Sequence, residues 1–188
     1  MKKKIFIGIG VALLIFVFWA VYGLFFAPKK SPGATASYND HGLDIKVTYS
    51  QPSKRGRVIF GEESTGALQP YGKYWRLGAN AATEITFKQN VIVGGMPVKA
   101  GTYRMYAIPG PEFFKIILNS EVGVNFTAAS DADHALDVLT MDIPVFPPAS
   151  EVETFTISFD YAYEVVNMNL AWDKVQLSVP MGLPEATN

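Results

Sequence analysis

One short segment carries most of the side chains that could recognise a ligand. Tyr71, Trp75, Arg76 and Asn80 lie within ten residues of one another, with glycines between them. Aromatic rings offer flat faces to sugars or cations, and Arg and Asn form planar, directional hydrogen bonds. Arg57 could line the same surface. The segment therefore predicts a ligand-binding site formed by these five residues.

The same residues also have a structural interpretation. Aromatic residues beside β-strands usually belong to the core, so Trp75 could fill the core while Arg76 and Asn80 tie down a loop. Arg57 could equally lie in a solvated loop. Residue types and spacing leave both interpretations open.

Acid–base and metal chemistry have few candidates, because the chain contains two histidines, His41 and His134. His41 lies in an Asn-Asp-His-Gly sequence, which is typical of a turn. Asp131, Asp133 and Asp137 flank His134 and could supply metal ligands, but their spacing matches neither an EF-hand loop nor a zinc-binding helix. Aspartates more simply cap a short helix. We therefore expect no metal and no cofactor.

Covalent catalysis has no recognisable motif in this chain. It contains no cysteine, no Gly-x-Ser-x-Gly elbow, no phosphate-binding glycine loop and no dinucleotide fingerprint. Glu62 and Glu63 are adjacent carboxylates, but a glycosidase needs two carboxylates across a cleft. We therefore expect no catalytic residue.

The elements that position these residues are predicted to be β-strands. Leu43, Ile45, Val47 and Tyr49 alternate with polar residues, which is typical of a strand with one face on a core and one in water. The same alternation recurs around Phe155–Phe159, Met168–Trp172 and Val175–Val179. Further predicted strands are Thr83–Lys88, Val91–Val93, Thr102–Ile108, Phe113–Asn119 and Leu136–Ile143.

Turn signals separate these strands. Gly94-Gly95 predicts a tight hairpin, and Pro109-Gly110-Pro111 predicts a break. The apolar positions change from even to odd numbers near Asp173-Lys174, which predicts a bulge or a turn there. Only the segment Ala128–Asp137 could form a short helix. The predicted fold is an all-β, antiparallel sandwich or partly open barrel, preceded by one N-terminal transmembrane helix.

The predicted transmembrane helix is an uncharged, almost wholly apolar run from Ile5 to Phe26, preceded by Lys2-Lys3-Lys4. Its length of about 33 Å as a helix matches a bilayer core of about 30 Å. A cleaved signal peptide is the alternative, but its apolar stretch is shorter and ends in a small-x-small site. We expect a retained anchor, with the membrane as a partner through residues Ile5 to Phe26.

The three N-terminal lysines outnumber Lys29 and Lys30, which favours an N-in, C-out orientation. Without those three lysines, the chain carries 13 basic residues and 17 acidic residues. This acidic balance means that nucleic acid is not expected as a partner. The predicted organisation is an anchor over 1–27, a tether over 28–34, a β-domain over 35–181 and a flexible tail over 182–188. The absence of cysteine excludes a disulfide framework.

Several motifs resemble the DUF2911 family, a bacterial family of unknown function. They span nearly the whole predicted domain: Ser31–Thr35, Tyr49–Gly61, Pro70–Thr83, Ala100–Tyr103 and Trp172–Pro180. Gln51 stands where that family commonly has arginine, and Ala81 where it commonly has glutamate, so a shared site would here lack one guanidinium and one carboxylate. The resemblance implies an exported β-sandwich-like domain, often tethered by a lipid or signal anchor, and implies no activity.

Together these observations predict a single-pass protein of the bacterial cytoplasmic membrane with its β-domain on the periplasmic or extracellular side. The expected function is binding of a glycan, a peptide or a small polar ligand. One alternative is an envelope-acting hydrolase, which requires two carboxylates or His134 beside Arg76 in one pocket. The other is a purely structural envelope protein, which requires no pocket near Trp75 and a large exposed apolar patch.

Overall fold

The structure is a computed structural model that describes residues 2–25, 31–124 and 131–185. The chain forms two compact units, Met1–Lys30 and Ser31–Asn188, and each is described by itself. The expected end of the apolar run at Phe26 and most of the expected tether lie outside the described residues.

The first unit contains one helix, α1 (Lys2–Phe25), of 24 residues. Its described side chains are exposed, and the rings of Trp19 and Tyr22 meet edge to face with their centroids 6.1 Å apart. Over the described residues, no helix combines the length and the apolar character that a membrane span requires.

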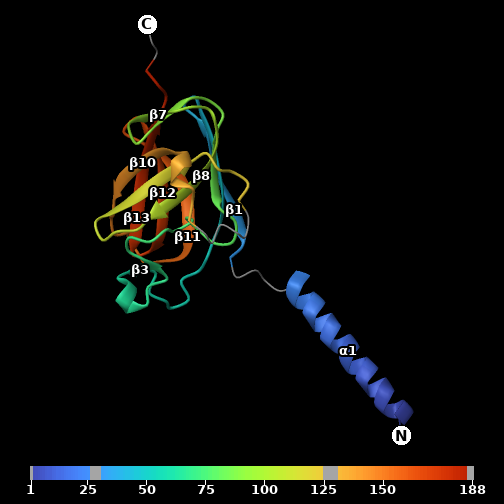
Figure 1. The fold of residues 1–188 in the computed structure, drawn as a ribbon. Coiled ribbons are helices and arrows are strands. Elements are labelled where there is room, and N and C mark those ends of the chain that lie inside the picture. The colour runs from blue at the N-terminus through green and yellow to red at the C-terminus, as the bar shows by residue number, and fades with distance from the viewer. Residues whose placement is uncertain (1, 26–30, 125–130, 186–188) are drawn as a thin grey trace. The chain divides into compact units, whose positions relative to one another are not determined.

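The second unit is built from two antiparallel sheets packed face to face (Figure 1). The six-stranded sheet has the order β1 (Gly33–Asp40), β2 (Leu43–Ser50), β5 (Thr83–Phe87), β8 (Gly101–Ile108), β9 (Phe113–Asn119) and β10 (Asp137–Pro144). The five-stranded sheet has the order β11 (Val152–Ala162), β12 (Val165–Asp173), β13 (Val175–Gly182), β6 (Val91–Val93) and β7 (Met96–Val98). The all-β, sandwich-like fold predicted from the sequence is confirmed.

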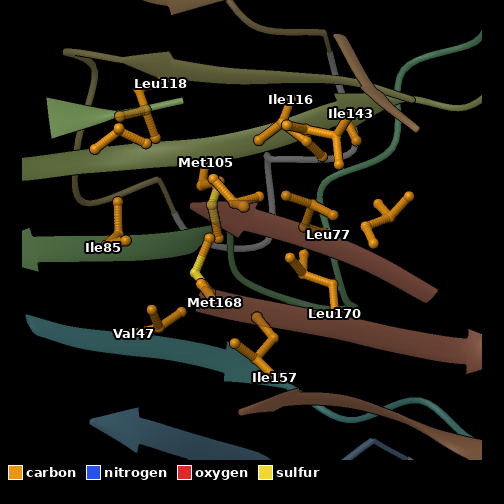
Figure 2. Packing of buried hydrophobic residues seen from close by; sticks show 14 of the residues in the cluster. Val47, Leu77, Ile85, Met105, Ile116, Leu118, Ile143, Ile157, Met168 and Leu170 are labelled. Carbon is orange, nitrogen blue, oxygen red and sulfur yellow. The ribbon is translucent and has the colours of Figure 1, made fainter. Parts of the chain in front are cut away.

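The core lies between the inner faces of the two sheets. Figure 2 shows Met105 and Ile116 of the six-stranded sheet facing Met168 and Leu170 of the five-stranded sheet, and all four are at most 2% exposed. Each such side chain contributes about 1.5–3 kcal/mol when it leaves water. The sides of the sandwich are also covered, because β1 contacts β11 and β10 contacts β13 and β7.

The predicted turns form where the sequence placed them. Gly94 and Gly95 join β6 to β7 with φ of 57° and 83°, values that glycine adopts without strain. Asp173 ends β12 with φ of 56°, and Trp172 pairs with Val175 across the turn. A turn therefore explains the change of parity between β12 and β13.

Several boundaries differ from the prediction, and three of them concern the tether, the tail and the short helix. Strand β1 begins at Gly33, inside the expected tether, because residues 33–40 pair with β2 along their whole length. Gly182, the first residue of the expected tail, belongs to β13 and pairs with Ile92. The expected short helix is a 3-10 turn, η3 (His134–Leu136), and its expected start at Ala128 lies outside the described residues.

An excursion between β2 and β5 was not predicted as regular structure. It contains β3 (Phe60–Gly61), the 3-10 turn η1 (Glu63–Thr65) and β4 (Gln69–Pro70), and β3 pairs with β4 in parallel. These elements are too short for their alternation to be recognised. The excursion brings Phe60 onto the aromatic part of the core and leads directly into the Tyr71–Asn80 segment.

Candidate functional site

The segment that leads from Tyr71 to Trp75 runs beside the second half of β8. The amide of Gly72 donates to the carbonyl of Pro109 at 2.8 Å, and Trp75 and Ala107 exchange two backbone hydrogen bonds of 2.8 Å. Extended backbone sends neighbouring side chains to opposite faces. Trp75 therefore points into the core, while Tyr74 points to the outer face of the six-stranded sheet.

Trp75 is a core residue, as in the structural interpretation of the sequence. It is 3% exposed, its ring stacks on that of Trp172 with centroids 5.8 Å apart, and Phe60 meets it edge to face at 5.1 Å. Burial leaves this ring no free face for a ligand, which corrects the expectation that it would stack on one.

The side chains of Arg76, Asn80 and Arg57 donate hydrogen bonds to backbone carbonyls of other residues in the domain. Arg76 Nη1 donates to the carbonyl of Asn80 at 2.7 Å, and Asn80 Nδ2 donates to the carbonyl of Ser31 at 3.1 Å. Arg57 Nη2 donates to the carbonyl of Ser53 at 2.7 Å. These contacts hold loops in place, and among the described residues Arg76 contacts neither a carboxylate nor His134. In the described part of the chain, the carboxylate or histidine contact that the hydrolase alternative expects beside Arg76 is therefore not present.

Of the five predicted residues, Tyr71 lines a surface groove in the described part of the chain. The groove has a volume of about 560 Å³, and Tyr71 is half-buried beside it. Its lining is mainly apolar and aromatic: Tyr71, Gly72, Ile108, Pro109, Gly110, Pro111, Glu112, Phe113, Lys115 and Asp142. Phe113 is 51% exposed, which is unusual for a phenylalanine.

The strand register places this groove on the outer face of β8, β9 and β10. Ile108 lies opposite Lys115, which lies opposite Asp142, and all three alternate with core residues. Lys115 Nζ and Asp142 Oδ1 form an ion pair of 2.9 Å at the groove wall. In the turn before β9, a Cβ added to Gly110 would lie 2.6 Å from the carbonyl oxygen of Phe113, so glycine is required for this wall.

A polar cluster lies further along the same outer face of β8, β9 and β10, beyond the groove. The hydroxyl of Tyr106 contacts both carboxylate oxygens of Asp137 at 2.9 Å and Nδ1 of His134 at 2.8 Å. His134 Nε2 lies 3.4 Å from Asp131, and Asn119 Nδ2 donates to Asp137 at 2.8 Å. The cluster attaches the end of the β9–β10 connection to the sheet.

Electrostatics in this cluster follow from burial and from the two carboxylates. Burial of its ring raises the pKa of Tyr106 strongly, and the hydrogen bond to Asp137 raises it further, so this hydroxyl stays protonated. Hydrogen bonds to Asp137 and then Asp131 raise the pKa of His134 against the opposing effect of desolvation. The remaining candidate ligand, Asp133, instead caps η3 by accepting from the amide of Ala135. Across the ranges 2–25, 31–124 and 131–185, no His, Asp or Glu groups are arranged to hold a metal ion.

Sequence reasoning missed most of the groove, although one signal was present. Phe113 and Phe114 are adjacent in a predicted strand, and only one of two neighbours can face the core. The structure buries Phe114 completely and leaves Phe113 outside. A phenylalanine on the solvent side of a strand, two residues after a Pro-Gly-Pro break, marks the groove wall.

Comparison with known proteins gives one match. A family model described as "Protein of unknown function (DUF2911)" matches residues 31–181. Neither the search of curated proteins nor the search of solved structures gave a match.

Proposed function

The chain belongs to the DUF2911 family, whose description gives no function, and we propose that it is a membrane-anchored binding module that holds a short peptide. The groove between Tyr71 and Phe113 is the binding site in this proposal. The observation that carries it is the exposed Phe113 ring in the wall of a preformed, mainly apolar groove. Ligand sites are concave, mostly apolar and equipped with a few polar groups.

A peptide fits the chemistry of this lining better than a glycan or a small polar ligand. The side chains of Tyr71, Ile108 and Phe113 offer apolar contact to one anchoring side chain of a partner. The charged groups Lys115 and Asp142 already neutralise each other, so they add little directional recognition of sugar hydroxyls. Glu112 and the ion pair form a polar rim around the apolar part, as at protein interfaces.

The anchor in this proposal is the run from Ile5 to Phe26, which contains no charged residue. Supporting it are the length of the run, which matches a bilayer core, and the lysines that precede it. The domain after residue 31 then lies on the periplasmic or extracellular side of a bacterial cytoplasmic membrane. Replacing Leu14 and Phe16 by Arg should release the protein from the membrane fraction during alkaline extraction, because each such charge opposes insertion by about 2.5–3.5 kcal/mol.

A matched control for the anchor test is the replacement of Lys2 and Lys3 by Arg, which keeps charge and apolar length. That variant should sediment with membranes like the wild type. Wild-type protein that is fully extracted at alkaline pH would contradict the anchor.

The peptide site is tested with an array of random hexapeptides and the full chain in detergent micelles. Wild-type protein should select peptides with a shared apolar or aromatic position, and Tyr71→Ser should lose them. The control Tyr163→Ser, which removes an exposed tyrosine that does not line the groove, should retain them. If free amino sugars or neutral glycans bind to the wild type and Tyr71→Ser loses this binding, the ligand of the groove is a glycan and not a peptide. Hydrolysis of the peptides on the array would support the hydrolase alternative instead.

A further inference from the structure

The outer face of the five-stranded sheet differs from an ordinary solvent-exposed sheet face. Strand pairing aligns Asp160 with Asn167, Ser158 with Asn169 and Ser178, and Ala171 with Thr156 and Gln176. Most of their neighbours along each strand are buried or partly buried core residues, so these side chains point outward. We call this set the amide face: Thr156, Ser158, Asp160, Asn167, Asn169, Gln176 and Ser178.

The amide face carries almost no charge. Its one charged side chain, Asp160, accepts hydrogen bonds from Asn167 Nδ2 at 3.1 Å and from Asn169 Nδ2. The outer face of the six-stranded sheet is the opposite case, with charges such as Lys46, Lys115 and Asp142 on its strands. Covering a charged face removes ions from water at a high free-energy cost, whereas amides and hydroxyls exchange water for a partner's hydroxyl groups at little cost.

A groove continues the amide face toward β6. It has a volume of about 580 Å³ and is lined by the apolar side chains of Ile92, Val165, Pro180 and Leu183 together with the carboxylates of Glu164 and Glu185. Val165 and Pro180 belong to the same outward rows as Asn167 and Ser178, because side chains alternate along β12 and β13. The hydrogen-bonding part and the apolar part are therefore one continuous surface.

An aromatic ring stands at the end of this surface. Tyr163 forms the β11–β12 turn with Glu164, which lines the groove, and its side chain is 99% exposed. Its φ of 53° is a conformation that a bulky residue adopts only at a cost. A wholly exposed tyrosine in a strained turn beside a groove is expected where a flat apolar surface is needed for a partner.

We propose that the amide face, with its adjoining groove and Tyr163, binds a neutral polysaccharide. Amide and hydroxyl side chains both donate and accept hydrogen bonds, as sugar hydroxyls require. The charged side chains of the surface, Asp160, Glu164 and Glu185, are all acidic, which disfavours nucleic acid, polyphosphate or an anionic membrane surface. Asn, Ser and Thr are short, so little side-chain entropy is lost when they are ordered by a ligand. The rings of sugars present C–H faces, which Tyr163 and Pro180 can cover.

This site is independent of the proposed peptide groove. The two lie on the outer faces of different sheets, and those faces point away from each other because both inner faces cover one core. The binding of a peptide and of a polysaccharide can therefore be removed separately by substitution.

The test is retention of the full chain, in detergent micelles, on cellulose, on chitin and in gels that contain a soluble neutral β-glucan. At least one of these probes should retain the wild type. Tyr163→Ser and Asn169→Ala should each lower retention at least about tenfold, the effect of losing roughly 1.4 kcal/mol of binding. Asn39→Ala, which changes an exposed asparagine on β1 of the other sheet, should be retained like the wild type.

Near-ultraviolet circular dichroism of each variant separates loss of binding from loss of fold, and Asn169→Ser provides a milder second substitution at the same position. No retention on any of the three probes overturns the proposal, as does equal retention of wild type, Tyr163→Ser and Asn169→Ala. A wild-type dimer in light scattering that Asn169→Ala dissociates, without retention on any probe, would assign the face to a second copy of the chain and also overturn it.

Discussion

The buried hydroxyl of Tyr106 donates to the carboxylate of Asp137 at 2.9 Å, and His134 Nδ1 lies 2.8 Å from the same hydroxyl. This relationship joins β8 to the start of β10 and to the 3-10 turn before it. His134 is 55% exposed and close to two carboxylates, so its protonated form interacts better with the folded protein than its neutral form.

The stability of the fold should depend on pH through His134. Its pKa is raised in the folded state, above an unfolded value of about 6.5. The stabilisation is therefore fully present below about pH 6.5 and is lost as the pH rises through the folded pKa. We expect the melting-temperature difference between wild type and His134→Gln to shrink from about pH 5.5 to pH 9. His41→Gln is the control, and a difference that grows with pH would contradict the proposed ion pairs.

Substitution by phenylalanine should lower the unfolding free energy more at Trp172 than at Trp75, the two core tryptophans that stack on each other. Trp172 Nε1 donates to the carbonyl of Glu153 at 3.3 Å, whereas Trp75 Nε1 is buried and has no acceptor among the described residues. Trp172→Phe should therefore cost about 1 kcal/mol more in unfolding free energy than Trp75→Phe, the net value of one hydrogen bond. Urea denaturation measures both.

Truncation of Trp75 provides the reference for a purely structural role. Trp75→Ala should cost about 3–5 kcal/mol, as for other large core side chains. Trp75→Phe should leave peptide binding at the Tyr71–Phe113 groove unchanged. Loss of peptide binding in a folded Trp75→Phe protein would return Trp75 to the ligand site that the sequence predicted.

Glycine is required at one position of the Tyr71–Asn80 segment and dispensable at another. Gly78 has φ of 147°, and a Cβ there would lie 2.8 Å from the backbone oxygen of Ser50. Gly72 also has positive φ, 73°, but faces open space. Gly78→Ala should lower the unfolding free energy by about 3 kcal/mol and Gly72→Ala by about 1 kcal/mol. Equal effects would show that the close approach of Gly78 to Ser50 does not constrain the loop.

The sequence predicted those parts of the fold whose signal is local. Alternation at Leu43–Tyr49 and the glycines at 94 and 95 determine burial and turn geometry within a few residues, and both predictions are confirmed. The order of the strands was not predictable in the same way. The residues that pair between β13 and β6 are about ninety positions apart in the chain, and their pairing depends on how the whole core packs.

The candidate site shows the same limit. Nothing near Trp75 in the sequence indicates that its backbone pairs with Ala107, and this pairing decides that its ring is buried. Likewise, the groove combines Tyr71 with Phe113 and Asp142 from distant strands. Residue types identified an aromatic segment, while the choice between core and surface came from long-range pairing.

The most direct test of the peptide-binding proposal compares two equally exposed phenylalanines. Phe113 and Phe146 are 51% and 52% exposed, but only Phe113 lines the groove. The peptide that the wild-type full chain selects from the array is titrated calorimetrically into wild type, Phe113→Ser and Phe146→Ser. We expect at least about tenfold weaker binding to Phe113→Ser, equivalent to losing 1.4 kcal/mol or more of apolar contact, and unchanged binding to Phe146→Ser. Equal affinity of all three proteins, or loss only with Phe146→Ser, would contradict the assignment of the groove.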